Sequence, residues 1–343
     1  TFARSVGYAV VKKPEGYTTA KVDQIIQEYE KKSANEQQST AKQYPNIITV
    51  VNETFADIKV LGNFKTNEDY MPYFHSLKKN CVTGYTYASI VGGQTANTEF
   101  ELLTGNTLGF LSAGTTAFQL YIHGQMPSLV SNLKAEGYSG NKAMHPFNPY
   151  NYNRPAVYKD FGFTDFIDKF DFPKNVKRVR EYISDEANVD RIISEYEKNR
   201  KKTDQPFYMY NMTIQNHSPY DKDAANFKQP IKIESSKYDA EANRYLNLIK
   251  YSDDSLKQLT SYFEKCKEPT IILFLGDHQP RLTDEFMNKI TNGQYQTWSS
   301  EQMMKRYQVP FVIWANYDIK EQHIEKTSMN YIQSILTKTA GVK

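Results

Sequence analysis

Residues 270–280 read Thr-Ile-Ile-Leu-Phe-Leu-Gly-Asp-His-Gln-Pro, an apolar segment that ends at Gly276 and is followed at once by Asp277 and His278. The segment from Ile271 to Gly276 is almost without polarity and rich in β-branched and aromatic side chains. This pattern is typical of a strand buried on both faces of a parallel sheet. Because ligands of open α/β sheets bind beyond the carboxyl ends of the strands, we expect half of a metal site here. Taken alone, the Asp-His pair fits a surface turn equally well.

The bulk composition limits the possible partners. The 343 residues suffice for one large or two ordinary domains, and a net charge of +3 with 24% charged residues implies no polyanion-binding surface. We therefore expect no nucleic-acid partner. The 26 tyrosines are compatible with an exported protein that handles sugars. Cys81 and Cys266 allow at most one disulfide, and two unpaired thiols are the simpler expectation.

No stretch of the sequence approaches the roughly 20 apolar residues that a membrane-spanning helix needs, and no signal peptide is visible. The chain begins with Thr1 rather than Met, so we interpret it as an excised part of a longer protein. The missing membrane segment is therefore no evidence that the parent protein lacks one.

Apolar runs alternate with helical patterns along the chain, which predicts a parallel or mostly parallel sheet covered by helices on both faces. We expect a connector with a packing helix in residues 1–44, and a catalytic domain in residues 45–343. The expected strands are 46–52, 84–89, 140–144, 207–214, 270–276 and 309–314. The expected helices are 21–32, 95–103, 128–136, 158–166, 186–198, 240–264 and 329–339.

Two further segments place polar groups where a strand ends or a helix begins. Glu53 follows the strand at 46–52, and the turn Gly92-Gly93-Gln94 precedes Thr95 at the start of a helix. Helix N-termini offer free N–H groups and a positive dipole end, which suit a phosphate. Each residue also has an ordinary interpretation, since Glu53 could be solvated and Thr95 could be a simple helix cap.

Glu53, Thr95, Asp277 and His278 together supply three oxygens and one nitrogen. This ligand set suits Mn²⁺, Mg²⁺ or Zn²⁺ and does not suit a soft metal. A threonine hydroxyl bound to such an ion loses its proton more readily and becomes a usable nucleophile.

Four motifs occur in the order found in bacterial phosphoglycerol transferases, the family of the lipoteichoic acid synthases. They are Val-Asn-Glu53-Thr-Phe, the glycine-flanked Thr95, Gln-Asn-His217-Ser-Pro and Gly-Asp277-His278-Gln-Pro. The resemblance covers about residues 45–320. It implies an alkaline-phosphatase/sulfatase-like fold, with Thr95 as nucleophile, Mn²⁺ as the metal, and His217 as acid toward the leaving alkoxide or donor to the phosphoryl group.

The middle of the chain resembles the family segment that holds glycerol phosphate. By that resemblance Arg154 would clamp the phosphoryl oxygens, and His145 and Tyr152 would bind phosphate or glycerol hydroxyls. Asn97 could lend its amide to the phosphate from the first helical turn. Without the resemblance, an ion pair, a loop histidine, aromatic packing and a helix-surface amide would be the simpler interpretations of these four residues.

Two departures from the family pattern concern the acceptor. Lipoteichoic acid synthases usually carry Lys where this chain has Gln94, and Trp where it has Tyr152. The segment 95–105 is closer to the branch that decorates cell-wall glycans with glycerol phosphate. The acceptor therefore stays open between a glycan and a polyglycerolphosphate chain.

The resemblance implies transfer of glycerol phosphate from phosphatidylglycerol through a covalent threonine intermediate. The parent protein would be anchored in the bacterial cell membrane, with this domain on the extracellular face. The alternatives are a phosphoethanolamine transferase, a phosphatase or sulfatase, and a catalytically idle glycan-binding domain. A sulfatase would need Cys or Ser in a Cys/Ser-x-Pro-x-Arg motif, which residues 95–99 lack.

Overall fold

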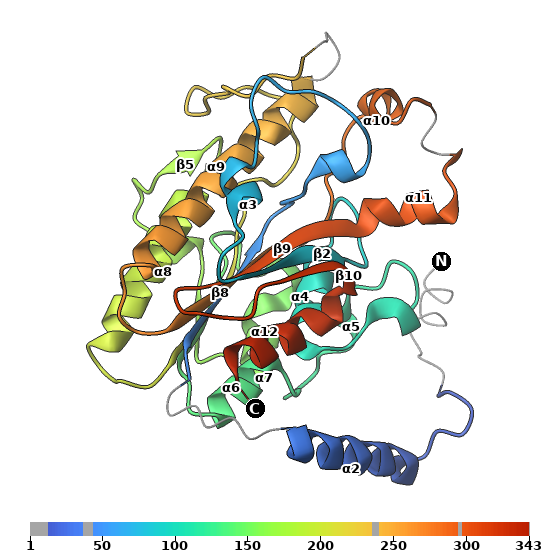
Figure 1. Ribbon diagram of the computed structural model, residues 1–343, viewed down its shortest axis with the longest axis vertical. Helices are drawn as coiled ribbons and strands as arrows, with labels where there is room; N and C mark the ends of the chain where they lie inside the picture. Colours follow the sequence, from blue (N-terminus) through green and yellow to red (C-terminus); the bar gives the residue numbers. More distant parts are fainter. Residues whose placement is uncertain (1–12, 37–43, 235–239, 294–296, 343) are drawn as a thin grey trace.

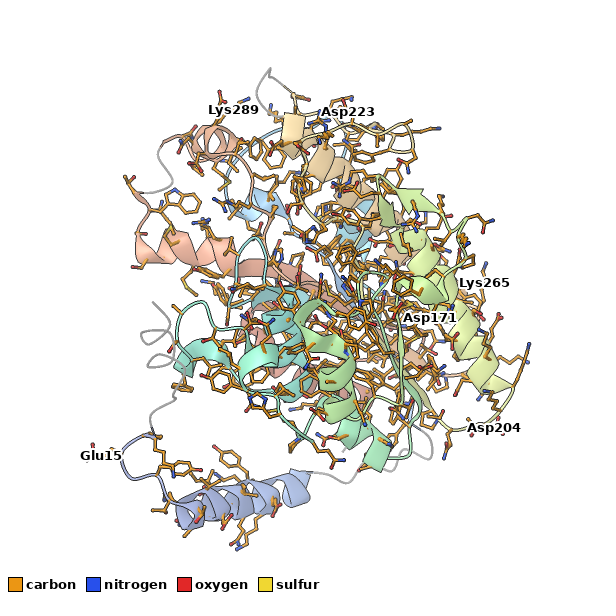
Figure 2. The ribbon with its side chains drawn as sticks, turned by 180° about the vertical axis from the view of Figure 1, so that it is seen from behind. Glu15, Asp171, Asp204, Asp223, Lys265 and Lys289 are labelled. Atoms are coloured by element: carbon orange, nitrogen blue, oxygen red, sulfur yellow. The ribbon has the colours of Figure 1, made fainter. Side chains whose placement is uncertain are left out.

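The computed structural model describes residues 13–36, 44–234, 240–293 and 297–342, excluding the side chains of residues 33–36. The segment that opened the sequence analysis is β8 (Thr270–Gly276), and every residue of it is buried. Within the described residues β8 lies in the middle of an eight-stranded sheet, in the order β10-β2-β9-β8-β1-β7-β3-β4 (Figure 1). The other strands are β1 (Asn46–Asn52), β2 (Cys81–Tyr87), β3 (Ser139–Met144), β4 (Asp165–Ile167), β7 (Phe207–Met212), β9 (Gln308–Ala315) and β10 (Gln322–Ser328).

The sheet is mostly parallel, as predicted. β9 pairs antiparallel with both β8 and β2, whereas the other ladders of this sheet are parallel. β1 and β8 pair in register from Asn46 opposite Thr270 to Asn52 opposite Gly276. The residues that follow these two strands therefore leave the sheet at the same level.

Helices cover both faces of the sheet, and each face has its own hydrophobic core. One core is formed with α4 (Thr95–Thr104), α5 (Ala117–Leu120), α6 (Leu129–Ala135), α7 (Arg154–Phe161) and α12 (Ile332–Ala340). The other is formed with α3 (Pro72–Ser76), α8 (Asp185–Arg200), α9 (Ala240–Phe263) and α10 (Asp284–Ile290). Figure 1 shows α8 and α9 running side by side across the second face. A small hairpin, β5 (Arg178–Val179) and β6 (Tyr182–Ile183), and α11 (Ser300–Met304) complete the body.

The predicted helix at 158–166 is wrong at both ends. α7 begins at Arg154 and stops at Phe161, because Gly162 adopts a left-handed φ of 100° as its C-cap. Residues 165–167 then form β4. The sequence analysis also did not anticipate β10, an edge strand whose residues are mostly exposed and charged or polar, and which therefore lacks an apolar pattern.

The N-terminal helix α2 (Thr19–Glu36) extends the expected helix at 21–32. Its apolar side chains Ile25 and Ile26 are 44% and 49% exposed, so they do not show the packing contact that we expected. The division of the chain at residue 44 stays a prediction. Cys81 and Cys266 are both free thiols. Within the described ranges, no helix has the length and apolarity to cross a membrane.

Gly276 is required by close packing at the end of β8. A Cβ atom there would overlap the backbone oxygen of Phe55, which cannot move without displacing the segment after β1. We expect Gly276→Ala to lower the free energy of unfolding by at least about 2 kcal/mol, measured by urea denaturation. Gly293→Ala is the matched control, because a Cβ there meets nothing within 4 Å. Equal stability of the two variants would contradict this packing.

Candidate active site and metal centre

Three side chains meet at the carboxyl edge of the sheet. Glu53 follows β1, and Asp277 and His278 follow β8; one ligand atom of each lies within 4.8 Å of the others, and all three residues are buried. His278 Nε2 lies 3.2 Å from Asp277 Oδ2 and 3.8 Å from Glu53 Oε1. The register of β1 and β8 thus brings together residues that are more than 200 positions apart in the chain.

Thr54 and Thr98 orient two of these groups. Thr54, with a left-handed φ of 53°, donates its backbone N–H to Asp277 Oδ1 at 2.6 Å and its hydroxyl to Glu53 Oε1 at 2.7 Å. Thr98 donates its hydroxyl to the backbone oxygen of Asp277 at 2.8 Å. His278 Nδ1 lies 3.0 Å from the backbone oxygen of Gln279 and therefore donates its proton there. This leaves Nε2 directed at the carboxylates, where it could serve as a metal ligand.

Within the described residues, hydrogen bonds do not satisfy all the polar atoms of this cluster. Asp277 Oδ2 and His278 Nε2 are buried and have no hydrogen-bond partner among the described residues. Burial and the neighbouring Asp277 raise the pKa of Glu53 to about 8. Two buried carboxylates with an unpartnered imidazole nitrogen fit a divalent cation of the Mn²⁺, Mg²⁺ or Zn²⁺ class.

Thr95 lies at the first position of α4 and faces the same cluster. Its Oγ1 donates to Glu53 Oε2 at 3.5 Å, and the residue is 7% exposed. The N-cap is Gln94, held at a left-handed φ of 66° and without a side-chain cap hydrogen bond. Thr95 is therefore not the helix cap, and its hydroxyl is available beside the metal cluster at the positive end of the helix.

A cavity of about 330 Å³, hereafter the catalytic cavity, opens directly over this cluster. It brings together most of the residues that the sequence analysis selected. Its lining includes Glu53, Gly92, Gly93, Gln94, Thr95, His145, Phe147, Tyr152, Arg154, His217, Tyr220, His278 and Arg281.

Arg154 is 2% exposed and is fixed by a buried ion pair. Its Nη2 and Nε donate to Glu99 Oε1 at 2.7 and 3.1 Å. Tyr158 and Tyr210 donate their hydroxyls to the other oxygen of Glu99, and burial together with this carboxylate raises both tyrosine pKa values well above their usual range. The guanidinium is thus held charged at the cavity wall.

His145 and Tyr152 also line the cavity. Burial and the nearby charge of Arg154 hold the pKa of His145 well below its usual value, so the ring is neutral. Its Nδ1 donates to the backbone oxygen of Met212 at 2.9 Å, which leaves the lone pair on Nε2 to accept a hydrogen bond. The ring of Tyr152, whose backbone is left-handed at φ 59°, lies 5.2 Å from the guanidinium of Arg154.

His217 also lines the catalytic cavity, from the loop after β7. Its Nδ1 donates to the backbone oxygen of Ser218 at 2.7 Å, which leaves Nε2 for the cavity. Its ring stacks on Phe147, with ring centroids 6.3 Å apart.

Arg180, from the turn between β5 and β6, holds this loop. Its two terminal nitrogens donate to the backbone oxygens of Gln215, His217 and Pro219 at 2.7 to 2.9 Å. Its guanidinium lies 5.3 Å from the ring centroid of Tyr182 and 5.8 Å from that of Tyr220. One side chain therefore fixes the backbone on both sides of His217.

The side chain of Asn97 forms its hydrogen bonds outside the catalytic cavity. Its side-chain nitrogen donates to the backbone oxygen of Thr115 at 2.7 Å, and its side-chain oxygen accepts from the backbone N–H of Ala117 at 3.0 Å. Asn97 is not among the residues that line the catalytic cavity. Its amide holds the loop before α5 through these two hydrogen bonds. A contact of this amide with phosphate stays a prediction.

The sequence analysis missed Glu99, Thr54, Arg180 and Arg281. Glu99 lies four residues after Thr95, and a carboxylate within an otherwise apolar helix face was a usable signal for a buried ion pair. Arg180 and Arg281 gave no such signal, because their contacts are made to loops remote in the sequence.

Comparison with known proteins agrees with this geometry. Residues 45–342 match the sulfatase family. A protein of Rhizobium meliloti (strain 1021) named for cyclic beta-1,2-glucan modification is 32% identical over 348 residues, covering 99% of this chain and 52% of that protein. The chain thus spans only about half the length of this curated relative.

Two solved structures share the fold. Streptococcus pyogenes phosphoglycerol transferase GacH, in complex with sn-glycerol-1-phosphate, aligns with a TM-score of 0.78 at 20% identity, over 97% of this chain and 85% of GacH. The lipoteichoic acid synthase LtaP from Listeria monocytogenes aligns with a TM-score of 0.71 at 23% identity, over 88% of this chain and 73% of LtaP. The predicted alkaline-phosphatase/sulfatase-like fold is confirmed.

The raised pKa of Glu53 predicts that metal binding releases a proton. In the metal-free protein Glu53 is largely protonated below pH 8, so a divalent ion must displace that proton. The affinity for Mn²⁺ should rise as the pH increases from 6 to 8 and then level off, as measured by isothermal titration calorimetry in buffers of different ionisation enthalpy. Glu53→Gln should abolish binding, whereas Asp204→Asn, at a side chain 97% exposed, should not affect it. An affinity independent of pH over this range would contradict the assignment.

The contacts of Arg180 predict that Arg180→Ala frees the His217 loop. We expect amide hydrogen exchange at residues 215–220 to accelerate by at least about tenfold, the loss of one hydrogen bond to a charged group, while exchange in β8 stays unchanged. Arg178→Ala is the matched control, because Arg178 lies in the same hairpin but donates only to the backbone oxygen of Glu181 among the described residues. Equal exchange in the two variants would show that Arg180 does not hold the loop.

Proposed function

The chain belongs to the sulfatase family, and from that premise we propose that it is a metal-dependent phosphoglycerol transferase. The donor is phosphatidylglycerol, and the acceptor is a hydroxyl of a cell-wall glycan or a polyglycerolphosphate chain. The observation that carries the proposal is the hydroxyl of Thr95, which stands 3.5 Å from Glu53 Oε2 at the N-terminus of α4 and faces the catalytic cavity. Sulfatase-family chemistry needs a nucleophile at this point, and Thr95 supplies it.

Glu53, Asp277, His278 and the hydroxyl of Thr95 would hold the metal. When bound, Mn²⁺ or a similar ion would neutralise charge on the phosphoryl group and lower the pKa of the threonine hydroxyl. Asp277 Oδ2 and His278 Nε2, which lie 3.2 Å apart and make no hydrogen bond within the described residues, support this use of the cluster. The identity of the ion is part of the proposal.

The reaction proceeds in two displacements. Thr95 Oγ1 loses its proton to solvent and attacks the phosphorus as the alkoxide, the bond to the diacylglycerol oxygen breaks, and protonated His217 gives its Nε2 proton to the departing alkoxide. The acceptor hydroxyl then loses its proton to His217 Nε2 and attacks the phosphorus, and the bond to Thr95 breaks, which restores the Thr95 alkoxide. The products are diacylglycerol and an acceptor that carries glycerol phosphate.

Arg154, His145 and Tyr152 bind the group being transferred. Arg154 lies in the cavity wall with its charge fixed by Glu99, so it can stabilise the phosphoryl oxygens without moving. The neutral His145 offers Nε2 as an acceptor for a glycerol hydroxyl. The structural likeness to GacH, which was solved with sn-glycerol-1-phosphate, supports this choice of ligand.

The lipid donor implies a location. We propose that the protein works at the extracellular face of the bacterial cell membrane, anchored by a segment outside these 343 residues. The curated relative from Rhizobium meliloti is about twice the length of this chain, which leaves room for such a segment.

Replacement of the nucleophile tests the mechanism directly. Thr95→Ala should reduce diacylglycerol release from phosphatidylglycerol vesicles by at least about a thousandfold, because the variant lacks the hydroxyl that forms the covalent intermediate. Thr95→Ser should keep part of the activity and should still yield a glycerophosphate adduct on a peptide containing residue 95, detected by mass spectrometry. Full activity of the alanine variant, with unchanged circular dichroism, would refute the covalent mechanism.

A further inference from the structure

A network of buried polar side chains joins the end of β1 to the loop that carries His217. Each of its members is no more than 1% exposed, and none of them is among the residues that line the catalytic cavity. The members are Asn52 at the end of β1, Asp185 at the start of α8, Gln215 and Asn216 in the loop after β7, and Ser252 in α9. Any effect of this network on the reaction must therefore pass through the residues that directly follow it in the chain, Glu53 and His217.

Asp185 lies at the centre of the network. Its Oδ2 accepts hydrogen bonds from Asn52 Nδ2 at 2.7 Å and from Ser252 Oγ at 2.6 Å. A longer hydrogen bond of 3.5 Å comes from Gln215 Nε2, and Gln215 Oε1 accepts the backbone N–H of Asp185 at 3.1 Å. Burial raises the pKa of this carboxyl. Oδ2 remains an acceptor even when Oδ1, which has no hydrogen-bond partner within the described residues, carries a proton.

An acceptor at this point sets the direction of the hydrogen bonds around it. Because Asn52 presents its Nδ2 to Asp185, its Oδ1 is left to accept from Asn216 Nδ2 at 3.0 Å. Because Ser252 gives its only hydroxyl proton to Asp185, its oxygen accepts from Asn216 Nδ2 at 2.8 Å. Asp185 therefore orients the two acceptors that hold the side chain directly before His217.

The two segments that the network joins are held differently. Asn52 pairs with Gly276 in the ladder between β1 and β8, and the backbone N–H of Glu53 donates to Thr213 Oγ1 at 3.0 Å. The loop that begins at Thr213 lies beyond the end of β7 and has no ladder of its own. The network thus fixes this loop to the end of β1, and with it the distance between His217 and the cluster that contains Glu53.

We propose that Asp185 is a positioning residue that holds the His217 loop in place relative to the end of β1. It acts through the side chains that it orients, Asn52, Ser252 and Asn216. This inference rests on the proposed function, in which His217 Nε2 gives a proton to one oxygen and takes a proton from another. Because Asp185 does not line the catalytic cavity, its loss lowers the rate of proton transfer and leaves the binding of metal and donor unchanged.

Asp185→Ala removes the acceptor, and Asp253→Ala is the matched control. Asp253 is a buried aspartate of α9 that accepts the backbone N–H groups of Tyr73 and Phe74 at 2.9 and 2.7 Å. Its loss removes hydrogen bonds of the same kind, but from α3 and not from the His217 loop. Diacylglycerol release from phosphatidylglycerol vesicles with Mn²⁺, Mn²⁺ affinity and the free energy of unfolding are measured for both variants.

We expect Asp185→Ala to lower kcat by at least about tenfold, because a small displacement of a catalytic group is costly, with the KM for the donor and the Mn²⁺ affinity of wild type. Asp253→Ala should lose stability and keep the wild-type kcat. Asp185→Asn keeps an acceptor oxygen without the charge and should restore most of the lost kcat.

Two kinetic outcomes would overturn the inference. An equal fall of kcat in Asp185→Ala and Asp253→Ala would assign the effect to lost stability. An Asp185→Asn variant as slow as Asp185→Ala would show that an acceptor oxygen at this position is not what the loop requires.

Amide hydrogen exchange separates this inference from the proposed function. In Asp185→Ala, exchange at residues 214–217 should accelerate by at least about tenfold, the loss of one hydrogen bond to a charged group, while exchange in β8 stays unchanged. If wild type releases no diacylglycerol, the proposed function fails, and this measurement still decides whether Asp185 holds the loop. Unchanged exchange at residues 214–217 would refute the inference even if donor cleavage is intact.

Ser252→Ala is the milder variant that serves if Asp185→Ala does not fold. It removes the hydroxyl that bridges Asp185 and Asn216 and leaves the carboxylate in place. We expect a lower kcat and faster exchange at residues 214–217, both smaller than in Asp185→Ala. Wild-type values of both quantities in Ser252→Ala would contradict a network that acts on His217.

Discussion

The site depends on two carboxylates and an imidazole that are buried together at the ends of two adjacent strands. Glu53 and Asp277 leave the sheet at the same level, and His278 joins them within a buried volume. Such a group is costly to bury unless a cation or a proton balances it. The raised pKa of Glu53 follows from this burial, because protonation removes one of the two negative charges. The hydrogen bonds from Thr54 and Thr98 fix the positions of the groups in the cluster.

The part of the cavity wall that contains Arg154 is balanced by an ion pair instead. Arg154 and Glu99 are almost fully buried, and the ion pair between them is completed by hydroxyls from Tyr158 and Tyr210. Because Glu99 stands one helical turn after Thr95, the helix that carries Thr95 also holds the guanidinium of Arg154. A displacement of α4 would therefore move both groups together. Under the proposed mechanism, this coupling preserves the distance between the attacking oxygen and the cation.

The third side of the cavity is formed by loops rather than by the sheet. His217 stands in a segment without regular structure, and its position depends on Arg180 and on stacking with Phe147. Loops are free to differ between related proteins, whereas strand ends are fixed by the ladder. The end of the cavity at Glu53, Asp277 and His278 is therefore the rigid part, and the His217 side is the part that is freer to differ between related proteins.

Local patterns were sufficient to predict the central strands, most of the helices between them and the meeting of Glu53, Asp277 and His278. Asn46–Asn52 and Thr270–Gly276 are continuous apolar runs that end in acidic residues, and parallel strands must end at one edge, so Glu53 and Asp277 could be expected to meet. The apolar pattern did not predict the ends of α7 or the presence of β10. The helix α7 ends before Gly162 because that residue adopts a left-handed backbone conformation, and β10 is an exposed edge strand with no apolar alternation.

The contacts made across long distances in the chain were decided only by tertiary packing. Arg180, Glu99 and Arg281 are ordinary charged residues in the sequence, and their significance comes from what folds against them. The amide of Asn97, close to Thr95 in the sequence, instead contacts the loop before α5. Periodicity and strand ends follow from the backbone and can be recognised within a few residues. The partner of a charged or amide side chain depends on which remote segment the core brings to it, and no local pattern contains that information.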